Sequence, residues 1–125
     1  MVNIDKTIIS LFEEQGINLI QFEPEIDVEL PCVTYQEYSN DTFRRTETDE
    51  YAKIRYSFTV TVIKNSEDLY SLIDIIDNIM YELNFTRLSL SPIIKERGVE
   101  HRTIMYGAIV SNERIYDYYS KNNIL

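Results

Sequence analysis

Residues 51–84 read YAKIRYSFTVTVIKNSEDLYSLIDIIDNIMYELN, which places a strand directly before a helix. In residues 52–62 apolar and polar residues alternate, which is typical of a strand with one buried face. In residues 69–83 the apolar residues recur at helical spacing and form one continuous stripe. Asn65 and Ser66, followed by two acidic residues, predict the start of this helix. We therefore expect the helix to lie on a sheet and to supply half of the core.

A second helix is predicted near the N-terminus, over residues 4–15. Asn3 can cap it, and Gly16 can end it because glycine tolerates the left-handed conformation that closes many helices. Its apolar residues share one face, which we expect to pack against the same core: Ile4, Ile8, Leu11 and Phe12.

The segment between this first helix and residue 51 predicts one clear strand. Residues 17–30 indicate an extended segment, at most an edge strand, because Pro24 and Pro31 cannot donate hydrogen bonds within a sheet. Residues 32–39 are rich in β-formers and predict a strand. The polar residues 40–50 predict a loop.

The segment after the central helix predicts two more strands. Residues 85–91 form a short strand that Pro92 ends, and residues 99–110 form a long one. The charged residues 95–98 indicate a turn between them. Residues 115–119 fit either a returning strand or a short helix, and both alternatives stay open.

The predicted elements follow in the order helix, strand, strand, helix, strand, strand. A chain of 125 residues suits one domain, residues 1–125, in which residues 120–125 are expected to form a frayed tail. The order predicts an α+β domain: a mostly antiparallel four-stranded sheet with the helices packed on one face.

The charge is concentrated in one segment. The net charge is −9, and residues 13–50 contain eleven acidic residues against two basic ones. Such a segment repels phosphate, so we expect no sequence-specific nucleic-acid binding; it can be a solvated surface or line a lumen. No stretch approaches the roughly 20 apolar residues of a membrane helix, and no secretory signal begins the chain. Folding in the cytoplasm is therefore expected.

The residues that usually carry chemistry are scarce. His101 and Cys32 are the only histidine and cysteine, whereas common zinc sites need several such ligands. The three glycines lie too far apart for a phosphate-binding loop. We interpret Cys32 as a buried thiol, and Asp74 and Asp77 as the wet side of the central helix. The sequence thus predicts no catalytic, cofactor-binding or metal-binding residue, and no enzyme.

Two groups of residues have the composition of an oligomer interface: the tyrosines Tyr116, Tyr118 and Tyr119, and the loop residues Phe43, Arg44 and Arg45. Tyrosine and arginine are enriched at interfaces, where an aromatic residue buries a large area and keeps a polar tip. Tyrosine is also a good β-former, so ordinary strand packing is an alternative for the first group. A flexible hairpin tip is the alternative for the second.

Three stretches together resemble a known family. They are LPCVTY at residues 30–35, where a proline opens a strand, YSFTVTV at residues 56–62, which runs into an amphipathic helix, and RTIMYGAIV at residues 102–110. In this order they resemble the tail terminator, or tail completion, proteins of long-tailed bacteriophages and of phage-tail-like particles. The likeness spans roughly residues 4–116.

The resemblance implies a structural protein without catalytic residues or cofactor. Such a protein forms a hexameric ring that caps the finished tail tube and offers a docking face to the head. The implied partners are copies of itself, the tail tube protein and the head–tail connector protein. The implied location is the host cytoplasm during assembly, then the virion or tail-like particle. We expect copies to associate through sheet edges and the loop at residues 40–50.

Other classes of function compete with this one. The chain could be a different phage structural part, such as a head–tail joining or baseplate protein. It could also be an acidic protein-binding module that mimics DNA, or a small hydrolase with an unrecognised site.

Overall fold

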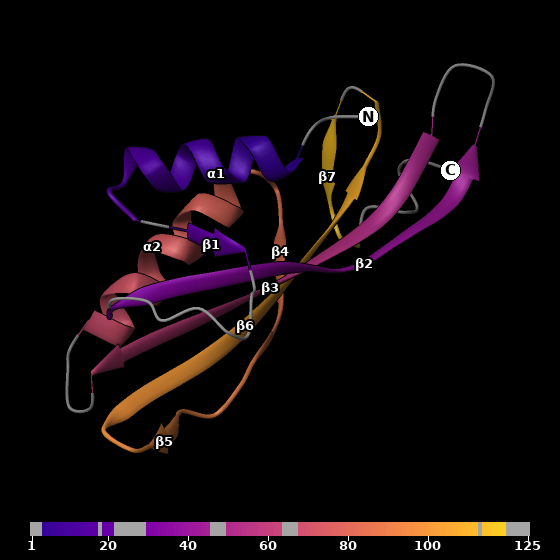
Figure 1. Cartoon of the computed structure of the whole chain (residues 1–125). Helices are drawn as coiled ribbons and strands as arrows, with labels where there is room; N and C mark the ends of the chain where they lie inside the picture. The colour runs from indigo at the N-terminus through magenta and orange to yellow at the C-terminus, as the bar shows by residue number, and fades with distance from the viewer. Residues whose placement is uncertain are drawn as a thin grey trace.

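The computed structural model describes residues 4–17, 19–21, 30–45, 50–63, 68–112 and 114–119. Two helices, α1 (Ile4–Glu14) and α2 (Asp68–Glu82), lie side by side on one face of a twisted sheet (Figure 1). The predicted α+β class is therefore confirmed. Within the described residues, neither helix is long and apolar enough to cross a membrane.

The sheet is larger than predicted and mixed. In the described residues it has seven strands: β1 (Leu19–Gln21), β2 (Cys32–Arg45), β3 (Glu50–Ile63), β4 (Thr86–Leu90), β5 (Ile94–Glu96), β6 (Val99–Val110) and β7 (Ile115–Asp117). The main order is β1-β2-β3-β6-β4, and β5 and β7 also pair with β6. The β1–β2 pair is parallel and the other pairs are antiparallel.

The four predicted strands do not include the three shortest ones, although β1 lies within the segment 17–30, for which an edge strand was an alternative, and does form an edge of the sheet. Strands β1, β5 and β7 have three residues each, too few for an alternating pattern to show. Two of the three residues of β5 are charged, which explains why residues 95–98 were interpreted as a turn. Of the two alternatives for residues 115–119, the strand is correct for the first three residues, which form β7.

The predicted loop at residues 40–50 was wrong over most of its length. Strand β2 continues to Arg45 and β3 begins at Glu50, and twelve residue pairs join the two strands, from Cys32 opposite Thr61 to Arg45 opposite Glu50. Backbone pairing with β3 holds these polar residues extended although their composition favours a loop. The outer part of the pair, residues 39–45 and 50–55, is called the arm below. It runs past the ends of both helices (Figure 1).

The core lies between the helices and one face of the sheet. The alternation predicted for β3 is confirmed, with every second residue buried from Ala52 to Val62. Ile76 of α2 and Phe58 of β3 are both fully buried in this core. Aromatic rings fill its centre: Phe58 stacks on Phe12 at 5.5 Å and meets Tyr106 edge-on at 5.7 Å between ring centres.

The opposite face of the sheet carries hydroxyl side chains instead of helices. Thr59 of β3 and Thr103 of β6 face each other across the strands, with their hydroxyls 3.0 Å apart.

Gly16 closes α1 with a φ of +72°, as predicted. The caps expected at residues 3 and 65–66, the segment 22–29 and the tail 120–125 lie outside the described residues.

Candidate interaction surface

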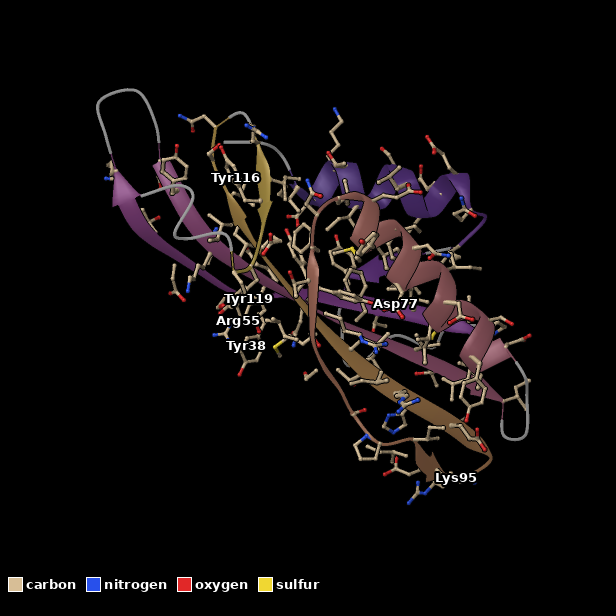
Figure 2. All side chains as sticks on the ribbon, turned by 180° about the vertical axis from the view of Figure 1, so that it is seen from behind. Tyr38, Arg55, Asp77, Lys95, Tyr116 and Tyr119 are labelled. Carbon is tan, nitrogen blue, oxygen red and sulfur yellow. The ribbon has the colours of Figure 1, made fainter. Side chains whose placement is uncertain are left out.

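The back of the sheet, where the arm meets the core, carries a cluster that we call the tyrosine–cation patch. It consists of Tyr38, Lys53, Arg55, Tyr118 and Tyr119. Lys53 and Arg55 point away from the helices because they alternate with the buried residues of β3. Tyr38 is the extra residue of a bulge in β2, and the last two tyrosines follow β7. Figure 2, turned by 180° from Figure 1, labels three of these residues, Tyr38, Arg55 and Tyr119, which lie close together in that view.

Each cation of the patch lies over an aromatic ring. The guanidinium carbon of Arg55 is 5.1 Å from the centre of the Tyr38 ring, and its Nε donates to Ser39 Oγ at 2.8 Å. The Nζ of Lys53 is 5.0 Å from the centre of the Tyr118 ring. Both distances suit cation–π attraction, which fixes the positions of long, otherwise mobile side chains.

Gly107 of β6 leaves the space in which the ring of Tyr118, in the C-terminal part of the patch, lies. A Cβ at this position would lie 2.5 Å from Cδ1 of Tyr118 and 2.8 Å from Cδ1 of Leu88. The backbone N–H of Tyr118 also donates to Thr86 Oγ1 at 3.1 Å. The ring of Tyr118 can therefore approach the backbone of β6 this closely only because residue 107 has no side chain.

The patch remains accessible, and similar contacts extend it along the arm. The exposed fractions of Tyr38 and Tyr119 are 56% and 73%. Further along, the rings of Tyr51 and Tyr116 lie 6.4 Å apart, and the guanidinium of Arg114 lies 5.0 Å from the Tyr116 ring centre. Tyrosines and cations thus share one end of the back face, a composition typical of interfaces.

The structure brings one of the two predicted groups of interface residues into this patch. Tyr118 and Tyr119 belong to it, and Tyr116 adjoins it. Arg45 instead lies on the arm, where it forms an ion pair with Glu50 at 3.5 Å and its side chain is 71% exposed. The side chains at positions 43 and 44 lie outside the described residues.

Sequence reasoning missed three members of the patch: Tyr38, Lys53 and Arg55. The alternation in β3 had already placed Lys53 and Arg55 on the face opposite the core, which is the signal that could have found them. No local pattern marks the bulge that presents Tyr38.

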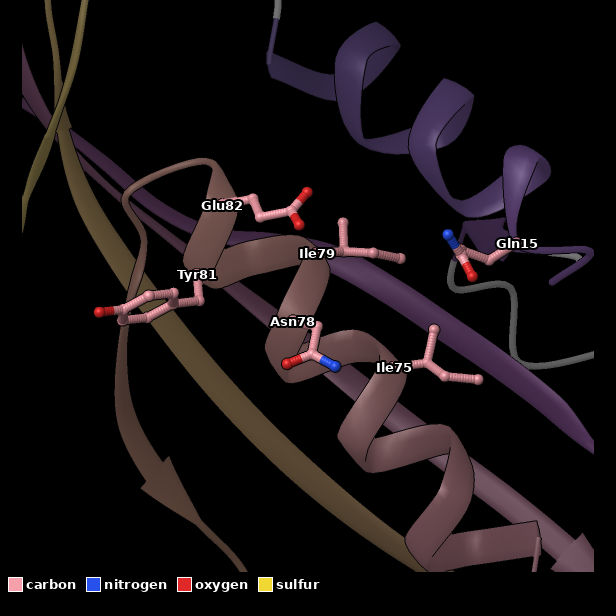
Figure 3. A pocket seen from close by; sticks show the side chains of 6 residues that line it. All are labelled: Gln15, Ile75, Asn78, Ile79, Tyr81 and Glu82. Carbon is pink, nitrogen blue, oxygen red and sulfur yellow. The ribbon is translucent and has the colours of Figure 1, made fainter.

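The other side of the molecule is acidic. The described helices carry seven acidic residues and one basic residue, Lys6. The acidic residues are Asp5, Glu13 and Glu14 on α1 and Asp68, Asp74, Asp77 and Glu82 on α2. Between the end of α1 and α2 lies a groove of 310 Å³, shown in Figure 3. Its lining residues are Gln15, Ile75, Asn78, Ile79, Tyr81 and Glu82.

The structure also places the residues examined for chemistry. Cys32 is buried, as predicted. Burial raises the pKa of its thiol, and a hydrogen bond with the Thr61 side chain offsets only part of this effect. Asp77 is not merely solvated, because its carboxylate accepts from Tyr106 at 2.5 Å and pairs with Arg87 at 3.1 Å. Among the described residues, no three His, Cys, Asp or Glu side chains form a metal-binding group. Comparisons with known protein families and with curated proteins find no match.

Proposed function

We propose that this chain is a structural assembly subunit that associates with copies of itself into a ring. By its resemblance, the ring is the hexameric terminator that caps a tail tube and offers a docking face to the head. Its partners are then the tail tube protein and the head–tail connector protein. It acts without catalysis or cofactor, in the host cytoplasm during assembly and afterwards in the particle.

The observation that supports this proposal is the tyrosine–cation patch. Exposed tyrosines beside ordered cations are the residues from which binding hot spots are built. Arg55 and Tyr38 hold each other in place before any partner arrives, which lowers the entropy lost on binding. A ring needs two different surfaces on each copy, and the back of the sheet and the helix layer differ in both shape and charge.

The mass of the native protein tests the proposal. We expect native mass spectrometry and sedimentation to give a closed oligomer, with the hexamer that the resemblance implies as the main species. A tube-capping assay then follows: the oligomer should bind one end of tubes assembled from the cognate tail tube protein. A protein that stays monomeric at concentrations well above those of assembly would contradict the proposal.

The acidic helix layer favours one alternative function, a protein-binding module that mimics DNA. Seven acidic residues on two adjacent helices present repeated negative charge, as a phosphate backbone does. The two functions differ in their oligomeric state, because a mimic acts as a monomer that captures basic proteins. The same mass measurement therefore separates them.

A further inference from the structure

We propose that the tyrosine–cation patch of one copy docks into the groove between α1 and α2 of the next copy. This inference rests on the proposed function, since it names the two surfaces that meet in the ring. The helices that border the groove cover one face of the sheet, and the cations of the patch point to the other face, so a contact between patch and groove joins two different surfaces of neighbouring copies. The contact is heterologous and repeats from copy to copy.

The groove has the form that an aromatic or long cationic side chain requires. Ile75 and Ile79 supply an apolar floor, and Asn78 and Glu82 supply polar atoms at the rim (Figure 3). Tyr81 stands beside it with 80% of its surface exposed. An arginine or lysine can lay its aliphatic stem on such a floor while its charged head meets the rim.

Charge decides the occupant. The two helices have seven acidic residues and one basic residue, and one of the acidic residues, Glu82, lines the groove itself. The helix layer therefore attracts cations and repels most of an acidic protein. The patch concentrates two cations, Lys53 and Arg55, on a chain whose net charge is −9. A second copy whose patch faces the groove therefore brings two cations and two exposed tyrosines, Tyr38 and Tyr119, against an acidic helix layer.

Exchange of the two charges tests the contact directly. The first variant carries Lys53→Glu and Arg55→Glu, and the second carries Asp74→Lys and Glu82→Lys on the exposed side of α2. Each variant alone opposes like charges at every contact, so we expect each to lose the oligomer. In an equal mixture, each altered surface meets the other altered surface and each native surface meets the other native one. We therefore expect the mixture to regain an oligomer of alternating copies.

The matched control reverses two cations outside the patch, Lys95→Glu and Arg97→Glu at the β5–β6 turn. Both residues are exposed, and Figure 2 shows Lys95 far from Arg55. This variant has the same net charge as the first and should keep the oligomer. Circular dichroism checks that all variants fold. Lys53→Gln with Arg55→Gln, which introduces no new charge, should weaken the oligomer less than the reversal does.

The outcomes separate this inference from the proposed function. A monomeric wild-type protein overturns both. A wild-type oligomer that both reversals leave intact, or folded monomeric variants whose mixture stays monomeric, overturns the inference and leaves the ring in place. Binding of a single-stranded oligonucleotide at physiological salt that the first reversal abolishes also overturns it, because the patch would then be a nucleic-acid site.

Discussion

Tyr56 of β3 and Tyr106 of β6 lie directly opposite each other in the sheet, and each donates its hydroxyl to an aspartate on a different helix. Tyr56 donates to Asp5 of α1, and Tyr106 donates to Asp77 of α2. Both tyrosines are buried in the core. This pair of bonds fastens each helix to the middle of the sheet and fixes where the two helices lie along it.

Removal of one hydroxyl should loosen one helix. We expect Tyr106→Phe to lower the free energy of unfolding by about 1–3 kcal/mol, because a hydrogen bond to a charged acceptor in a partly buried position is lost. The ring itself stays and keeps its edge-on contact with Phe58. Urea unfolding followed by circular dichroism gives the measurement.

Asp77→Asn is the companion variant to Tyr106→Phe: it keeps an acceptor for the tyrosine hydroxyl but removes the charge, and its cost includes the loss of the ion pair with Arg87. If the negative charge of Asp77 strengthens the hydrogen bond, Asp77→Asn should also lower the free energy of unfolding. It should lower it by less than Tyr106→Phe does, because the amide oxygen can still accept from the Tyr106 hydroxyl. A Tyr106→Phe variant as stable as the wild type would show that the hydroxyl does not hold α2 to the sheet.

The same tyrosines predict a loss of stability at high pH. Burial, and then the bond to a carboxylate, raises the pKa of Tyr56 and of Tyr106 above the ordinary value of 10.0. The unfolded chain loses these protons near pH 10 while the folded chain keeps them, so the free energy of unfolding should fall above about pH 10. Below that pH their contribution is fully present.

Unfolding measured from pH 8 to pH 12 tests this expectation, with tyrosinate absorbance as a direct readout. Tyr106→Phe should flatten the alkaline decline, because it removes one of the groups whose pKa is raised in the folded chain. If the stability of Tyr106→Phe falls with pH as steeply as that of the wild type, the raised pKa of Tyr106 does not contribute to the alkaline decline.

The buried stripe of α2 gives a third expectation. Ile76 is fully buried between the helix and the sheet, so Ile76→Ala should cost about 2–5 kcal/mol, the range for large-to-small changes in cores. Ile75, on the same helix but half-buried at the groove, is the control and should cost less when changed to alanine. A cost below about 1 kcal/mol at Ile76 would contradict the observed packing.

The predictable parts of the fold are those in which apolar residues recur at the spacing at which side chains share one face of a strand or of a helix. The alternation of β3 and the stripe of α2 are local signals, since each residue's face follows from its neighbours. The extension of β2 over residues 40–45 has no such signal. Its polar residues are held by hydrogen bonds to a strand that follows them, and pairing of this kind is invisible to local propensity.

The patch was predictable only in its parts. Tyrosines near the C-terminus suggested an interface, but the contact of Tyr118 with Gly107 joins segments that only the pairing of β6 and β7 brings together. The role of Gly107, leaving space for a ring, depends on which residue lies above it, and no local pattern in the sequence shows that.

The last prediction concerns the close approach of the Tyr118 ring to Gly107. Gly107→Ala places a methyl group where Cδ1 of Tyr118 and Cδ1 of Leu88 lie, so the tyrosine has to leave the sheet. We expect a cost of about 1–3 kcal/mol, as for other overpacked sites, together with loss of the Lys53–Tyr118 contact and a weaker oligomer.

A double-mutant cycle with Tyr118→Ala isolates this contact from any effect of alanine on the backbone. Once the ring is absent, the nearest atom to the new methyl group is Cδ1 at the end of the flexible Leu88 side chain, which can turn aside. Gly107→Ala should therefore cost less in the Tyr118→Ala background than in the wild type, and the two changes should not add. Additive costs would mean that the glycine is needed for the strand itself, and that the ring of Tyr118 does not depend on it.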